Sequence, residues 1–463
     1  MINTSKETIF ALSTNYAQSA IAIIRISGSN CKKIAKMLCR LSNPKERYAH
    51  YCKIYDLESN IIDKGMVIFF KAPKSYTGEN LLEIHIHGSI AIINKLTKTL
   101  EKIPKTRASL PGEFSKRAFM NGKGNMLYFE GINNLINAET ENQRMIANKQ
   151  IYGDSSEICY SWRERIIKYL SYVDAQIEFA EEINTTKNHD IKTSLAETIQ
   201  DIENAYQSII HSKNLIHGTS IMIIGPSNAG KSSLFNLLLQ EERMIVSSIK
   251  GTTTDQTEQN IDIYGHKVKL IDSAGIRDTK NKIEKKGVSK TYETLKKIDK
   301  FILVLSPDCN TRENFQAIND LIGKLDKKQT IILFNKNDLK HSKIKFEEWY
   351  FKVPKIKTIK SFTISCKQNN YNHNMLKQLY EFIKKNLISV DTKFNDYYFS
   401  ELRHKKCLER LLKNLKEAIQ AIDDLEICAK YLRDALFDLD SLYGKHNDED
   451  KLGIIFNKFC IGK

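Results

Sequence analysis

Four short stretches carry residue types and spacings that suit a nucleoside triphosphate. The first is "GPSNAGKSS", which places Gly225 and Gly230 ahead of Lys231 in the G-x-x-x-x-G-K-S spacing. Glycines let backbone N–H groups surround phosphates, and the start of a helix adds positive potential. A lysine here reaches the outer phosphates, and the hydroxyl of Ser232 suits Mg²⁺. We therefore predict a P-loop, with Lys231 as a catalytic residue.

The base is predicted to be guanine. "NKND", residues 335–338, follows the apolar run "TIILF". Asp338 can accept hydrogen bonds from the N1–H and exocyclic amine of guanine, and adenine offers neither group. "SCK", residues 365–367, resembles the loop that closes over guanine in GTPases. The chain is therefore interpreted as a GTPase.

Two further stretches complete the nucleotide motifs. "DSAG", residues 272–275, resembles the D-x-x-G loop that holds Mg²⁺ through water, and "GTTTD", residues 251–255, supplies a switch threonine. The predicted GTP-binding residues are Gly225, Asn228, Ala229, Gly230, Lys231, Ser232, Ser233, Ser247, Ser248, Ile249, Lys250, Gly251, Thr252, Thr253, Asp272, Ser273, Ala274, Gly275, Asn335, Lys336, Asp338, Ser365, Cys366 and Lys367.

The residue after the D-x-x-G glycine is Ile276, which cannot orient water as the glutamine of Ras-like enzymes does. The carbonyl oxygen of Asn228, together with oxygens from "VSSIKGTTT", could instead cage a monovalent cation beside the phosphates. The alternative is that Asn228 is only a turn residue.

The elements that must position these residues fall into three segments. Residues 1–122 read as α+β: "SAIAIIRISG" and "KGMVIFFKAP" have strand patterns, and "CKKIAKMLCRL" and "IAIINKLTKTLEKI" have helical spacing. Residues 217–383 alternate strands and helices, as a parallel α/β sheet should. Apolar stripes between Trp162 and Ile177, and between Leu408 and Leu425, predict one helical bundle from residues 123–216 and 384–463.

Composition limits the remaining possibilities. The net charge is +16, from 71 Lys+Arg against 55 Asp+Glu, which favours a polyanionic partner. The alternative is that Lys, Asn and Ile are simply abundant in the proteins of this organism. The nine cysteines include no C-x-x-C pair, which favours a reducing cytosol over a disulfide framework. The longest apolar runs are far below the roughly 18 residues that span a bilayer. We expect a cytoplasmic protein without a membrane anchor.

The chain as a whole resembles the MnmE (TrmE) family of tRNA-modification GTPases. The resemblance rests on "IAIIRISG", "SYTGENLLEIHIHGS", "PGEFSKRAFMNGK", "DAQIEFAEE", "ELRH", "YLRDAL", the terminal "FCIGK" and the nucleotide motifs. It implies three domains: an N-terminal tetrahydrofolate-binding-like domain that dimerises, a helical domain, and a Ras-like G domain inserted into it. It also implies a homodimer that works with the FAD protein MnmG (GidA), in a heterotetramer. Together they would add an aminomethyl or carboxymethylaminomethyl group to C5 of the wobble uridine of certain tRNAs.

The resemblance also assigns roles to single residues. The one-carbon donor would be 5-formyl- or 5,10-methylene-tetrahydrofolate, and hydrolysis would depend on K⁺-linked pairing of G domains. Glu284 matches the glutamate that helps position the catalytic water. The matched ligand sets are Ser232 and Thr253 for Mg²⁺, Asn228, Ser247, Ile249 and Thr252 for K⁺, and Arg25, Glu83, Lys123 and Lys463 for folate.

The chain departs from the family pattern in places. Thr254 replaces the arginine of G-T-T-R-D, Ser273 replaces a threonine, and Ala180 replaces a proline. Gly124, Asn125 and Met126 follow Lys123 where the family has Leu-Asp-Leu. His85 and His87 form an H-x-H pair, for which strand packing or lining of the folate pocket is expected ahead of metal binding.

The terminal "FCIGK" has two further interpretations. Cys460 stands fourth from the end, as in a prenylation box, which would make the protein a Ras-like membrane switch. Lys463 and Gly462 fit that box poorly. Alternatively, Cys460 is a catalytic nucleophile toward uridine or a packed thiol.

A ribosome-assembly GTPase would share the nucleotide motifs but would not explain the N-terminal motifs.

Overall fold

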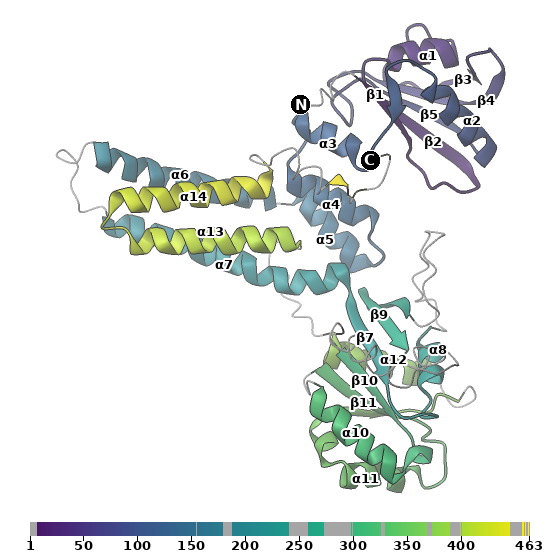
Figure 1. The fold of residues 1–463 in the computed structure, drawn as a ribbon, viewed down its shortest axis with the longest axis vertical. Helices are drawn as coiled ribbons and strands as arrows, with labels where there is room; N and C mark the ends of the chain where they lie inside the picture. The colour runs from purple at the N-terminus through teal and green to yellow at the C-terminus, as the bar shows by residue number, and fades with distance from the viewer. Residues whose placement is uncertain are drawn as a thin grey trace, which may run out of the picture. The chain divides into compact units, whose positions relative to one another are not determined.

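The computed structural model of the protein describes residues 7–153, 155–178, 188–239, 258–272, 298, 300–325, 329–367, 373–388, 399, 401–444, 456–457, 459 and 462 (Figure 1). Contacts divide the chain into two compact units. One comprises Met1–Asn133, Gln150–Ile202 and Lys406–Lys463, and the other Asn134–Lys149 and Glu203–Lys405. This division into two units does not test the three predicted domain boundaries, which stay a prediction.

The first unit contains a six-stranded sheet of order β3-β4-β5-β2-β1-β6. Its pairings are antiparallel except for β1 with β6. The strands are β1 (Thr8–Leu12), β2 (Ser19–Ser27), β3 (His50–Tyr55), β4 (Ile61–Phe70), β5 (Leu81–Gly88) and β6 (Thr106–Ala108).

One face of this sheet is covered by two helices, α1 (Cys31–Cys39) and α2 (Ile90–Glu101). Alternate residues of β2 and β5, including Ile24, Ile26 and Ile84, are buried against them. Because side chains alternate along a strand, the intervening residues Ile23 and Arg25 face the opposite side.

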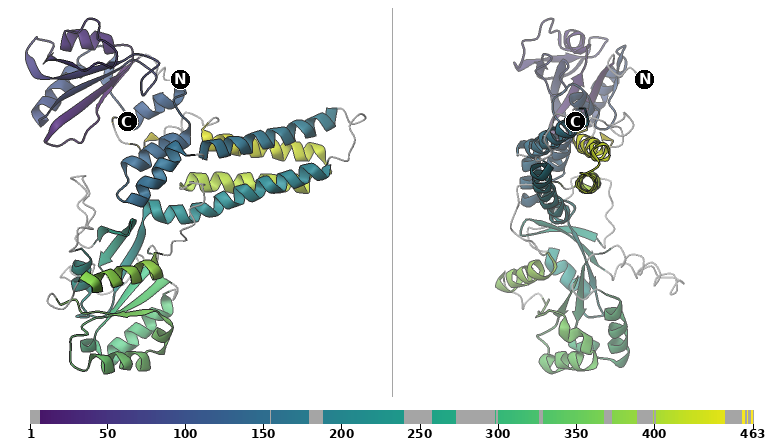
Figure 2. Two further views of the ribbon diagram at one scale, coloured as in Figure 1. Left: turned by 180° about the vertical axis from the view of Figure 1, so that it is seen from behind. Right: turned by 90° about the vertical axis from the view of Figure 1, so that its left-hand side faces the viewer.

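Helices make up the rest of the first unit. They include α6 (Ser155–Glu178) and α14 (Leu425–Tyr443), which run side by side in both views (Figure 2). Arg163 pairs with Asp440 at 2.7 Å, and Arg433 pairs with Asp174 at 2.6 Å. The other helices here, some continuing into the second unit, are α3 (Glu113–Met120), α4 (Met126–Ile136), α5 (Glu141–Tyr152), α7 (Asn188–His217) and α13 (Leu402–Gln420).

The second unit is built on another six-stranded sheet, of order β12-β11-β10-β7-β9-β8. All neighbours are parallel except β8 and β9. Its elements are β7 (Thr219–Ile224), α8 (Lys231–Leu239), β8 (Glu258–Ile263), β9 (His266–Asp272), β10 (Lys300–Leu305), η3 (Pro307–Cys309), α10 (Arg312–Lys324), β11 (Thr330–Phe334), α11 (Ser342–Lys352), η5 (Pro354–Thr358), β12 (Ser361–Thr363) and α12 (His373–Leu387).

The predicted fold class is confirmed: an α+β sheet domain, a helical part and a parallel α/β P-loop domain. Two details of the apolar stripes were wrong. Ile177 is exposed, and Tyr169 and Gln176 are buried on α6 instead. The second stripe is not continuous, because α13 ends at Gln420 and Asp424 caps the new helix α14 by accepting from the N–H of Ile427. Among the described residues, no helix is long and apolar enough to cross a bilayer.

Candidate nucleotide and C-terminal sites

The predicted P-loop lies between β7 and α8, as its sequence context requires. Gly225 has φ 149° and Gly230 has φ 93°, which are backbone conformations that residues with a side chain rarely adopt. A Cβ at Gly225 would lie 2.2 Å from the carbonyl oxygen of Val304, and one at Gly230 would lie 2.1 Å from Nδ2 of Asn335. Both glycines are therefore required by the backbone itself. Asn228 also has a positive φ of 62°, so its turn role is real.

Lys231 and Ser232 begin α8 and point back over the loop. The Nζ of Lys231 donates to the carbonyl oxygens of Gly225 at 3.1 Å and Pro226 at 2.8 Å. The hydroxyl of Ser232 donates to Oδ2 of Asp272 at 2.9 Å. Asp272 is the last residue of β9, so the adjacent parallel strands β7 and β9 bring these two side chains together. Hydroxyl and carboxylate oxygens form the donor set that Mg²⁺ prefers, so these residues fit that ion.

Asn335 joins the P-loop to the loop after β12. Its side-chain amide donates to the carbonyl oxygen of Ala229 at 3.0 Å, and its Oδ1 accepts from the N–H of Cys366, also at 3.0 Å. The residue is only 2% exposed. The phosphate and base ends of the predicted site are therefore connected by one side chain.

The predicted base-binding residues gather at the same edge of the sheet. The hydroxyl of Ser365 donates to Oδ1 of Asp338 at 2.6 Å. Burial raises the pKa of Cys366 to about 12, and the charge of Asp338 adds to this, so the thiol stays neutral. Lys336 forms an ion pair with Asp308 at 2.8 Å. Because Ser365 bonds Oδ1 of Asp338 and Lys336 is paired with Asp308, the Oδ2 atom of Asp338 can accept a hydrogen bond from a base.

Ser233 and Lys367 are exposed, and the remaining predicted nucleotide residues lie outside the described residues. The latter are Ser247, Ser248, Ile249, Lys250, Gly251, Thr252, Thr253, Ser273, Ala274, Gly275 and Glu284.

A second candidate site lies on the open face of the N-terminal sheet. Arg25 and Glu83 are register partners on β2 and β5 and form an ion pair at 2.9 Å. The hydrogen bond with His85, aided by the charge of Arg25, holds the pKa of Glu83 below its ordinary value despite burial. The Arg25 guanidinium also lies 5.4 Å from the ring centre of Tyr76. Donors, an acceptor and an aromatic face therefore meet at one point.

The C-terminal segment reaches this point. The carbonyl oxygen of Gly462 accepts from Nη1 of Arg25 and from the hydroxyl of Ser13, each at 3.2 Å. Phe456 and Phe459 are buried in a cluster with Phe129, whose ring centre lies 6.2 Å from that of Phe456. Cys460 and Lys463 lie outside the described residues.

Lys123 makes different contacts from Arg25 and Glu83. Its ammonium group donates to the carbonyl oxygen of Pro73, and its Cε would lie 3.1 Å from a Cβ at Gly78. Asn125, which stands where the family has other residues, accepts from the N–H of Tyr128 at 2.9 Å and so supports the start of α4.

The two histidines have local partners. His85 lies 3.4 Å from Glu83, and His87 lies 2.9 Å from Asp63. Sequence reasoning gave no role to Ser13, which lies in none of the quoted motifs, or to Tyr76, which lies in the motif "SYTGENLLEIHIHGS" but was not among the matched folate contacts.

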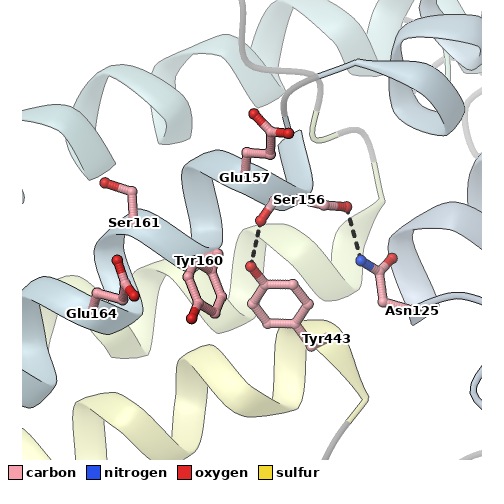
Figure 3. A pocket seen from close by; sticks show the side chains of 7 residues that line it. All are labelled: Asn125, Ser156, Glu157, Tyr160, Ser161, Glu164 and Tyr443. Atoms are coloured by element: carbon pink, nitrogen blue, oxygen red, sulfur yellow. Dashed lines mark hydrogen bonds between the residues drawn. The ribbon is translucent and has the colours of Figure 1, made fainter.

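A cavity of about 500 Å³ lies beside α6 and α14, away from the predicted residues (Figure 3). Tyr443 donates to the carbonyl oxygen of Ser156 at 2.6 Å, and Asn125 donates to its hydroxyl at 2.8 Å. The carboxylates of Glu157 and Glu164 also line it. Two carboxylates repel phosphate, so this cavity is not a nucleotide site.

Comparisons with known proteins cover the whole chain. A family model described as "GTP-binding protein TrmE N-terminus" matches residues 8–123, and one described as "MnmE helical domain" matches residues 127–460. A "tRNA modification GTPase MnmE" of Pelagibacter ubique (strain HTCC1062) is 37% identical over 98% of this chain and 100% of its own length.

Other relatives agree. A protein of the same description from Aquifex aeolicus (strain VF5) is 36% identical over 99% of this chain and 100% of its own length. The FeoB G-domain of Methanococcus jannaschii, a solved structure, is 21% identical over 36% of this chain and 98% of that chain. Its TM-score to this chain is 0.25.

Proposed function

The chain belongs to the MnmE family of tRNA modification GTPases, and from this premise we propose that it couples GTP hydrolysis to modification of C5 of the wobble uridine in certain tRNAs. Matches over both the N-terminal and helical parts disfavour a membrane-switch or ribosome-assembly GTPase, because neither would need those parts.

The GTP site uses residues at the carboxyl edge of the second sheet. Asp338 accepts from the guanine N1–H and amine while Ser365 holds its other oxygen. Lys231 exchanges its contacts with the Gly225 and Pro226 carbonyls for phosphate oxygens. The N–H groups at the start of α8 face the phosphates.

The metal ions act at the phosphate end. Ser232 would hold Mg²⁺ with Thr253, and Asp272 would act through water. Mg²⁺ held by these residues would neutralise charge that develops on the phosphates. Asn228, with Ser247, Ile249 and Thr252, would hold K⁺ where G domains of a homodimer meet, and Glu284 would orient the attacking water. Of this potassium set only Asn228 lies among the described residues, so that step rests on the resemblance.

The N-terminal site would hold a tetrahydrofolate derivative, which supplies the one-carbon unit. Glu83 suits the amino and N–H groups of a pterin, Arg25 suits its polar oxygens, and the Tyr76 ring offers a stacking face. Lys123 and Lys463 would meet the glutamate tail. An FAD protein of the MnmG type would act with it in a heterotetramer to complete the aminomethyl or carboxymethylaminomethyl group.

The observation that carries the folate proposal is the hydrogen bond from Arg25 to the Gly462 carbonyl. It supports a pocket to which the C-terminal segment contributes a backbone carbonyl oxygen. Binding of 5-formyl-tetrahydrofolate, measured by calorimetry, should weaken at least about tenfold in Arg25→Gln, since a charge-assisted hydrogen bond is worth roughly 1.5–3 kcal/mol. Arg107→Gln, which breaks ion pairs with Glu7 and Glu113 elsewhere in the same unit, is the matched control. Equal affinities for both variants would refute the assignment.

A further inference from the structure

The open face of the N-terminal sheet continues from the Arg25–Glu83 pair to the edge strand β3. Strand register aligns Tyr51 with Met66, Met66 with His85, and His85 with Ile23. Register partners point to the same face of a sheet, so these four side chains form one row across it. Arg25 and Glu83 stand in a parallel row two residues along.

The edge end of that row is exposed and positively charged. Tyr51 is 67% exposed and Met66 is 40% exposed. Lys53 and Lys64 are directly opposite each other on β3 and β4, and both are exposed. Like charges at directly opposed positions destabilise a sheet. Among the contacts of the described residues, neither lysine is paired with a carboxylate, so the pair has no internal compensation.

Aromatic rings lie close to lysine ammonium groups in this part of the chain. The Lys64 ammonium lies 4.4 Å from the ring centre of Tyr51, and that of Lys45 lies 5.4 Å from the ring of Tyr48, which is 52% exposed. Residues 7–123 carry 19 Lys and Arg against 9 Asp and Glu, a net charge of +10 out of +16 for the chain. Exposed rings beside unpaired cations are the surface that single-stranded nucleic acid requires, with bases stacked and phosphates neutralised.

We propose that the β3–β4 edge of this sheet binds the single-stranded anticodon loop of the tRNA. Lys53 and Lys64 contact loop phosphates, and Tyr51 stacks on a base. The loop then follows the open face toward Glu83 on β5, two strand spacings or about 10 Å away, and Arg25 on β2, three spacings or about 14 Å away. This inference rests on the proposed function, because it needs a tRNA whose modified base lies in the anticodon.

The test uses the full-length protein and a fluorescein-labelled anticodon stem–loop hairpin, with a blunt RNA duplex of the same stem as the comparison probe. Anisotropy gives Kd at several KCl concentrations. The test variants are Lys53→Gln/Lys64→Gln and Tyr51→Ala. The control is Lys98→Gln/Lys102→Gln, which removes two exposed lysines of or next to α2, on the covered side of the sheet.

The expected results differ between these variants. Loss of two phosphate contacts lowers the salt slope by about 1.4 and raises Kd about 25-fold at 0.1 M salt. Tyr51→Ala raises Kd about 5- to 150-fold with little change in slope, because stacking is uncharged. The α2 control, and GTP turnover in all variants, stay at the wild-type level. Thermal unfolding checks that each variant is folded.

Two outcomes overturn the proposal, and each is distinguishable from failure of the proposed function. If the wild type prefers the stem–loop over the duplex and the test variants do so equally, the docking surface is elsewhere while the function stands. If the variants instead change the oligomeric state, measured by sedimentation, with loop binding unchanged, the face binds a second copy of the chain. A wild type without preference for the loop counts against both.

Discussion

Replacing Asn335 by alanine removes a side chain that connects the P-loop to the base-binding loop. The variant loses two hydrogen bonds of 3.0 Å, one to the Ala229 carbonyl and one from the Cys366 N–H. Each contributes about 1 kcal/mol, and a buried group left without a partner costs about 1–3 kcal/mol. With one buried partner left without a bond, the sum is about 3–5 kcal/mol, at a position that is only 2% exposed.

Part of that cost appears in nucleotide affinity, since GTP contacts both loops. A loss of about 2 kcal/mol corresponds to a Kd for GTP raised about 30-fold. Titration with a fluorescent GTP analogue measures it. Asn335→Asp keeps the acceptor for Cys366 but places a buried carboxylate against the Ala229 carbonyl oxygen, so we expect a rise at least as large as for alanine.

A matched control is Asn310→Ala. Asn310 also donates two hydrogen bonds of 2.8 Å, to the Lys345 carbonyl and to Glu348, within the same unit. That variant should lose stability in thermal unfolding while its GTP affinity stays within about threefold of wild type. If Asn335→Ala and Asn310→Ala changed GTP affinity equally, the connection between the loops would have no role in binding.

The remaining predictions concern the nucleotide site and His266, the first residue of β9. Asp338→Asn should weaken GTP binding at least about 100-fold, because two hydrogen bonds to a charged acceptor are lost, and it should favour XTP in a competition assay. Glu284→Ala should lower kcat for GTP about 100-fold or more with unchanged Kd, and equal turnover would count against its role in orienting water. Exchange of K⁺ for Na⁺ should also lower kcat, and equal turnover in the two salts would count against the potassium site. Burial, followed by the charge of Lys384, lowers the pKa of His266 from 6.5 to about 4. Between these pH values the unfolded chain therefore binds more protons than the folded chain. The free energy of unfolding should decrease as the pH falls from 6.5 toward 4. His266→Asn should flatten that part of the curve of melting temperature against pH, and an unchanged slope rejects the cause.

The sequence predicted what short motifs and strong periodicity encode. The P-loop followed from residues that are neighbours in the chain, and the parallel sheet of residues 217–383 from its alternation of strands and helices. The edge strand β3 was missed, because "HYCKIY" mixes a lysine, a histidine and tyrosines on a surface where no apolar face is needed. The end of α13 was missed because Ile422 continued the apolar spacing into a turn.

Long-range contacts were the least predictable part of the candidate sites. The amide of Asn335 reaches Ala229, 106 residues away, and the carbonyl of Gly462 reaches Arg25, 437 residues away. The nucleotide motifs placed Asn335 and Ala229 in one site and the family resemblance placed Arg25 in the other, while Gly462 was assigned to neither. Neither could say which atoms meet, because that depends on strand order and on how the chain end packs through Phe456 and Phe459.

The central claim is tested most directly by nucleoside mass spectrometry of tRNA from cells with the gene deleted and from cells complemented with the wild-type or Lys231→Ala gene. The account predicts loss of the 5-substituted wobble uridine on deletion, its return with the wild-type gene, and no return with Lys231→Ala. An unchanged content of the modified uridine in the deletion strain would contradict it.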